Sequence, residues 1–103
     1  MAKYLMSWKL RLSGTAQQNH DDGKKLLDTF AKWKMPSDQN FLQFLARVDG
    51  TGGYAVVETD NPAGLTDAPS KFGTWLEFDV TPVVDIMDNV AVVAAGAEFR
   101  ESI

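Results

Sequence analysis

Apolar and polar residues alternate at the start of the chain. Over residues 4–12 every second residue is apolar, and from residue 7 on the residues between them are Ser7, Lys9 and Arg11. This period of two is typical of a β-strand with one buried face. Residues 13–19 are polar and contain a glycine, which predicts a loop.

A helical period follows the loop. Apolar residues recur at intervals of three and four between positions 26 and 33, which predicts an amphipathic helix over residues 21–34. Asp21 or Asp22 is placed to accept the first backbone amides of this helix as its N-cap. Pro36 is expected to stop the helix.

The second half of the chain predicts further strands and helices. Residues 41–49 and 53–59 are rich in aromatic and β-branched residues and flank a glycine-rich turn, which is typical of a hairpin. Asn61 and Pro62 indicate a helix start, and Pro69 is expected to break that helix after residue 68. A strand is predicted over 75–84, where a proline requires a sheet edge or a strand end. The last segment fits a helix, although its valines leave a strand open.

This order of elements predicts the fold class. A β-α-β-β-α-β order is that of an α+β ferredoxin-like plait, with a four-stranded antiparallel sheet and helices on one face. A C-terminal helix is added to it. We expect a single domain over residues 1–103, with a core over 4–86 and a helical tail over 87–103.

Alternation also assigns side chains to the two faces of the sheet. The helix-covered face is expected to carry Met6, Trp8, Leu42, Phe44, Ala55, Val57, Leu76, Phe78 and Val80. The opposite face is expected to carry Leu5, Ser7, Lys9, Arg11, Phe41, Gln43, Leu45, Arg47, Tyr54, Val56, Glu58, Trp75, Glu77, Asp79 and Thr81. This face has six apolar groups among its charged ones, which is more typical of an interface with polar pockets than of open surface. Arg47 and Glu58 could pair within such an interface. A merely amphipathic exposed face remains the alternative.

Composition restricts the class of protein. With 103 residues, 45% of them hydrophobic and 23% charged, the chain is typical of one globular domain. The absence of cysteine excludes disulfides and thiol chemistry. The longest apolar stretch, residues 90–97, is far shorter than the roughly 20 residues of a membrane span, so we expect a cytoplasmic protein without a membrane partner. The net charge of −4 argues against nucleic acid as a partner.

The candidate chemistry is sparse. His20 is the only imidazole, and two aspartates follow it. Three adjacent residues at a helix start cannot all converge on one ion, so no metal and no cofactor are expected. A general-base role for His20 stays open, because imidazole titrates near neutrality. The glycines at 50–53 precede a strand and not a helix, which favours a hairpin turn over a phosphate cradle.

The opposite sheet face supplies the other candidate ligand-binding residues. Glu58 and Glu77 carry carboxylates on that face, and Tyr54 and Trp75 are expected beside them. A few convergent polar groups among aromatic ones are typical of a small-molecule site. The candidates are therefore Arg47, Tyr54, Glu58, Trp75, Glu77 and His20.

Three blocks of sequence carry a resemblance to a known family. They are residues 6–8 (Met-Ser-Trp), 52–60 (Gly-Gly-Tyr-Ala-Val-Val-Glu-Thr-Asp) and 80–85 (Val-Thr-Pro-Val-Val-Asp). Through them the chain resembles the Domain of Unknown Function 3303 family, within the wider group of dimeric α/β-barrel proteins, over about residues 4–86. The resemblance implies a plait-type fold and a homodimer, and it implies no activity.

Three functions are compatible with these observations. The first is a homodimer that binds a small molecule or a protein partner between its two sheets without catalysis. The second is a cofactor-independent enzyme similar to monooxygenases or isomerases, with Glu58, Glu77 or His20 as the proton-transfer group. The third is a purely structural interaction module, which predicts a filled space between the sheets.

Overall fold

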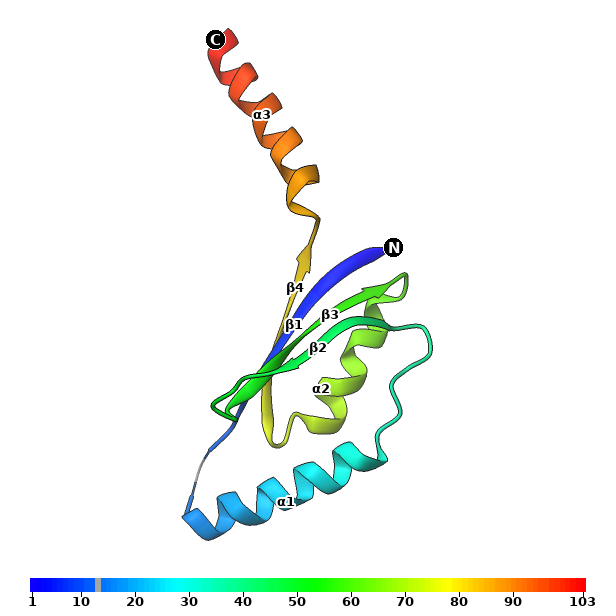
Figure 1. Cartoon of the computed structure of the whole chain (residues 1–103), viewed down its shortest axis with the longest axis vertical. Coiled ribbons are helices and arrows are strands. Elements are labelled where there is room, and N and C mark those ends of the chain that lie inside the picture. Colours follow the sequence, from blue (N-terminus) through cyan, green and yellow to red (C-terminus); the bar gives the residue numbers. More distant parts are fainter. Residues whose placement is uncertain (13) are drawn as a thin grey trace.

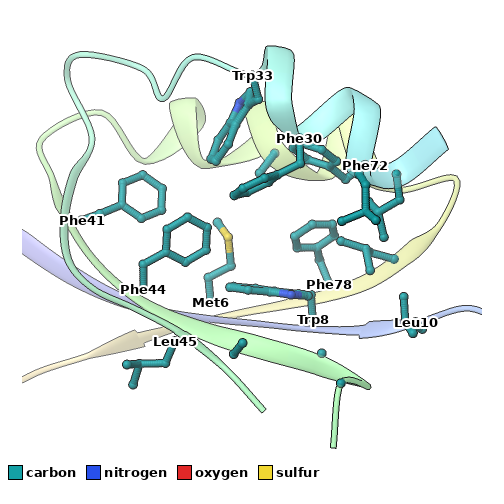
Figure 2. Close-up of a pocket in the computed structure, with 17 residues that line it drawn as sticks. Met6, Trp8, Leu10, Phe30, Trp33, Phe41, Phe44, Leu45, Phe72 and Phe78 are labelled. Atoms are coloured by element: carbon teal, nitrogen blue, oxygen red, sulfur yellow. The ribbon is translucent and has the colours of Figure 1, made fainter. Parts of the chain in front are cut away.

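The computed structural model describes residues 1–12 and 14–103. The elements are β1 (Ala2–Leu10), α1 (Ala16–Lys32), β2 (Asn40–Ala46), β3 (Gly52–Thr59), the 3-10 turn η1 (Pro62–Thr66), α2 (Asp67–Phe72), β4 (Leu76–Val83) and α3 (Ile86–Ser102). All strand pairs are antiparallel, and the strand order is β2-β3-β1-β4. With α1 and α2 on one side of the sheet (Figures 1 and 2), this arrangement confirms the predicted α+β plait.

Helix α1 begins earlier than the sequence predicted. Its N-cap is Thr15, whose Oγ1 accepts the amide of Gln18 at 3.1 Å, while Gln18 Oε1 accepts the amide of Thr15 at 2.8 Å. This reciprocal capping box satisfies two amides at once. The predicted cap at Asp21 or Asp22 is therefore wrong, and Asp21 accepts a hydrogen bond from Gln17 within the helix. The predicted loop is reduced accordingly, and its first residue, Ser13, lies outside the described residues.

Pro69 does not break the second helix. Turn η1 leads directly into α2, and α2 continues to Phe72. Pro69 is the third residue of α2, where a backbone amide would have no partner inside the helix. The proline therefore fits the first turn, and the predicted break before Phe72 is wrong.

A β-bulge changes the faces in strand β2. The pairing register with β3 shifts between Phe41 and Gln43, so Phe41 lies on the helix side and packs against the core. Leu42 at the bulge is 45% exposed. The predicted faces of Phe41 and Leu42 are thus wrong, because one extra residue in a strand reverses the alternation before it. Trp75 was also assigned wrongly, since it lies in the turn before β4 and packs against the core.

The core is small and lies mainly beneath η1 and α2. Its buried hydrophobic residues are Met6, Ala55, Val57, Leu65, Ala68, Phe72 and Leu76. Helix α1 contributes none of its described residues to this buried set. A space therefore remains between α1 and the sheet.

The C-terminal segment is a helix, which removes the alternative of a strand. Helix α3 extends away from the sheet (Figure 1), and the molecule measures 63 × 30 × 22 Å along its principal axes. An ion pair of 2.7 Å between Lys3 Nζ and Asp85 Oδ1 ties the start of α3 to β1. Several large apolar side chains of α3 are exposed: Ile86, Met87, Val90, Val92, Val93 and Phe99.

Candidate functional site

The sheet face that α1 and α2 leave uncovered is called here the open face. Its cross-strand rows on β3, β1 and β4 are Glu58–Lys3–Val83, Val56–Leu5–Thr81, Tyr54–Ser7–Asp79 and Gly52–Lys9–Glu77. On the edge strand β2, Gln43 and Leu45 extend the second and third of these rows. The open face therefore has an apolar centre, formed by Leu5, Leu45, Tyr54 and Val56, between an end that carries Lys3 and Glu58 and a charged end that carries Lys9 and Glu77.

A hollow of about 620 Å³ lies at the charged end, beside the turn between β2 and β3. It is called here the polar hollow, and it is lined by Ser7, Trp8, Lys9, Leu10, Leu12, Arg47, Thr51, Tyr54, Glu77, Phe78 and Asp79. The hollow is within the usual size range of small-molecule sites.

Arg47 is held in place on one wall of the hollow. Its Nη2 and Nε donate to the two carboxylate oxygens of Asp49 at 2.8 and 3.2 Å, and Nε also lies 3.0 Å from Thr51 Oγ1. Its Nη1 donates to the hydroxyl of Tyr54 at 3.1 Å. The hydrogen bonds from Arg47 and Thr51 hold the pKa of Asp49 well below its ordinary value. In turn, the hydrogen bond with Asp49 raises the pKa of Arg47, so this pair stays charged at all physiological pH values.

The other wall carries charges of both signs. Lys9 Nζ lies 3.3 Å from Glu77 Oε2, across the β1–β4 pair. Asp79 lies next to this pair, opposite Ser7. The hollow therefore offers hydrogen-bond donors on Arg47 and Lys9 and acceptors on two carboxylates, which suits a small polar molecule with groups of both kinds.

The structure brings three of the six predicted ligand residues together. Arg47, Tyr54 and Glu77 line the polar hollow. Glu58 lies at the other end of β3, opposite Lys3, so the predicted pairing of Arg47 with Glu58 is not formed. Alternation assigns Arg47 and Glu58 to the same face, but only the register of the hairpin shows that they lie at opposite ends of it.

The remaining two predicted residues lie elsewhere. Trp75 packs against the core, and His20 is exposed on α1. The residue that sequence reasoning missed is Asp49, because an Asp-Gly pair between two strands indicates only a turn. Its role in fixing Arg47 follows from the turn itself, in which Asp49 also accepts the amide of Thr51 at 3.1 Å.

The described residues include no group of three or more histidine, aspartate or glutamate side chains that could hold a metal ion. None of the helices formed by residues 1–12 and 14–103 has the length and apolar character needed to cross a bilayer.

Comparison with known proteins identifies the family. Curated proteins give no match to this chain. The family model described as "Domain of unknown function (DUF3303)" matches residues 2–97, which is nearly the whole chain. The chain therefore belongs to the DUF3303 family.

Proposed function

We propose that this protein is a homodimer that binds a small polar molecule between its two sheets, without catalysing a reaction. The observation that carries the proposal is the open face, where an uncovered apolar centre adjoins the polar hollow. The apolar centre favours pairing of the open face with a second copy of the chain, and the polar hollow leaves room for a ligand beside that contact.

The apolar centre supports the dimer. Leu5, Leu45 and Tyr54 are 37%, 53% and 39% exposed on the open face. Apolar groups clustered on a sheet face are typical of an interaction surface. A two-fold pairing uses the same surface on both copies, so it covers both centres without further chain. We expect such an interface to bury at least about 1,200 Å² in total.

The polar hollow supports the binding role. It adjoins the apolar centre through Tyr54, which belongs to both. A second sheet over the hollow would exclude water and strengthen the interactions of Arg47, Lys9 and Glu77 with a ligand. The preformed position of Arg47 lowers the entropy lost on binding.

Light scattering of the purified chain at micromolar concentration tests the dimer. We expect the mass of two chains, and a mass of one chain would contradict the proposal. Tyr54→Glu should convert the dimer to monomers, because it places an unpaired charge in the centre of the contact. Ala31→Glu, which adds the same charge on the exposed side of α1, is the matched control and should remain dimeric.

Mass spectrometry of the dimer tests the binding role. Under native conditions we expect a mass in excess of two chains, and the excess should appear as a small molecule after denaturation. Arg47→Ala should lose that molecule while keeping the mass of a dimer. A wild-type dimer without bound molecules, whose crystal structure shows the space between the sheets filled by side chains, would favour a purely structural module.

A further inference from the structure

We infer that the chain has a second binding site, for an uncharged apolar molecule, in the space between α1 and the sheet. This space is called here the aromatic cavity, and its volume is about 450 Å³. It lies on the opposite side of the sheet from the open face and within one chain. The inference is therefore independent of the proposed dimer.

Aromatic rings from both sides surround the cavity (Figure 2). The sheet contributes Trp8, Phe44 and Phe78, while the helices contribute Phe30, Trp33 and Phe72. These rings point toward one another across the space in Figure 2. Aliphatic side chains complete the wall, among them Met6, Leu10, Leu26, Leu27 and Leu76.

One end of the cavity is closed by direct contacts. Trp33 Nε1 donates to Asp67 Oδ2 at 2.9 Å, which ties the end of α1 to α2. The ring of Trp33 meets Phe72 edge-on, with centroids 5.4 Å apart. Phe30 meets Phe44 across the cavity at 6.1 Å. These contacts fix the height of the helix above the sheet at that end.

Toward the middle of α1 the helix leaves its apolar side chains partly uncovered. Phe30, at the anchored end, is still 49% exposed, and Leu27, about one turn nearer the middle of α1, is 69% exposed, although both line the cavity. At the sheet, Gly53 allows the Trp8 ring to lie flat against the strand, since a Cβ there would meet the ring at 2.5 Å. The sheet side of the aromatic cavity therefore presents the face of the Trp8 ring. An apolar ligand would bury apolar surface of the sheet and of α1 that the helix alone leaves uncovered.

The lining chemistry defines the class of ligand. None of the described side chains that line the cavity carries a charge, so a charged ligand would lose its hydration without gaining a partner. The indole N–H of Trp33 is already bonded to Asp67. The volume lies within the range of small-molecule sites, and aromatic rings favour edge and offset contacts with other rings. The cavity therefore suits an uncharged molecule with two or three fused or linked rings.

A matched pair of fluorescent probes tests this inference on the full chain. N-phenyl-1-naphthylamine is uncharged, and 1-anilinonaphthalene-8-sulfonate has the same rings with an added sulfonate. We expect the uncharged probe to bind with one molecule per chain, and at least about tenfold more tightly than the sulfonate. Energy transfer from the tryptophans to the bound probe, among them Trp8 and Trp33 in the cavity wall, should report binding.

Cavity-filling variants locate the site. Ala46 faces the cavity from β2, next to Gly53, and Ala46→Phe should weaken binding of the uncharged probe at least about tenfold. Ala31→Phe makes the same change on the exposed side of α1 and should leave the affinity unchanged. Leu27→Asp, at an exposed lining position, should also weaken binding at least about tenfold. No saturable binding of the uncharged probe, equal affinity for both probes, or full affinity in Ala46→Phe and Leu27→Asp would each overturn the inference.

Discussion

Single residues in the turn between β2 and β3 fix the position of the Arg47 guanidinium, which lines the polar hollow. Asp49 accepts hydrogen bonds from Arg47 and from the amide and hydroxyl of Thr51. One carboxylate therefore shapes the turn and aims the guanidinium at Tyr54. Because Asp49 holds Arg47, a change at Asp49 affects both the shape of the turn and the position of the guanidinium in the polar hollow.

Asp49→Asn tests this linkage. The pKa of Asp49 is lowered in the folded chain, so its contribution to stability is present above its ordinary value of 3.8 and is lost as the pH falls below that value. We expect Asp49→Asn to lower the Tm at pH 7, and the difference from the wild type to shrink as the pH falls below 3.8. Thermal unfolding followed by circular dichroism between pH 2 and pH 7 measures this. An equal difference at all pH values would contradict the assigned role of the carboxylate.

His20 provides the contrasting case at the residue scale. It is exposed on α1, outside the residues that line the polar hollow or the aromatic cavity. Surface residues without special contacts typically change stability by less than about 0.5 kcal/mol when replaced. We therefore expect His20→Ala to match the wild type in urea unfolding and in probe binding. A loss of more than about 1 kcal/mol would assign His20 a structural role.

At the scale of the elements, the cap of α1 matters because α1 forms the roof of the aromatic cavity without burying any described residue of its own. Its stability depends more on local interactions than that of a packed helix would. Thr15→Ala should cost about 1 kcal/mol of stability, since it removes the side-chain acceptor of the capping box. Gln18→Glu, which preserves the box, is the control and should cost little. Urea unfolding monitored by helical ellipticity measures both.

The elements also show how far the sequence predicts the structure. Strand positions and the plait topology followed from alternation and from turn chemistry, because both act over neighbouring residues. The cap at Thr15 was missed although its Thr-x-x-Gln spacing is a known signal, because Asp21 offered a competing one. The bulge at Leu42 has no comparable local signal, since it results from pairing with a strand distant in space.

The candidate sites were predictable to different degrees. Alternation correctly put Arg47, Tyr54 and Glu77 on one face, but only the hairpin register decides which of them share a hollow. The aromatic cavity cannot be predicted from the apolar periodicity of α1. A helix packed tightly on a sheet and a helix separated from the sheet by a cavity have the same periodicity. The separation depends on where α1 is anchored, at Trp33 and Asp67.

At the scale of the whole molecule, the open face and α3 both present apolar side chains that no other described element covers. Helix α3 lies outside the body formed by the sheet, α1 and α2 (Figure 1). A helix of 17 residues with valines in its centre is marginal in water when nothing packs against it. Association of two copies would offer apolar surface to both α3 helices.

This arrangement predicts that α3 takes part in the proposed dimer. Val93→Glu adds a charge to the exposed apolar part of α3, where Val93 is 58% exposed in the single chain. We expect the variant to dissociate at least about tenfold more readily than the wild type, because the charge would have to be desolvated at the contact. Sedimentation equilibrium measures the dissociation constant. Glu98→Gln, which removes a charge on the same helix, is the control and should not weaken the dimer. Equal dissociation constants for Val93→Glu and the wild type would exclude α3 from the contact.

The short link between β4 and α3 has a consequence for how this protein unfolds. Only Val84 and Asp85 separate the two elements, so α3 has little freedom to return to its own sheet. If its helical state depends on a second copy, folding of α3 and association are one equilibrium, and the stability of the protein rises with its concentration. Ellipticity at 222 nm and the Tm should then both decrease on dilution, and the decrease in ellipticity should amount to the contribution of this one helix.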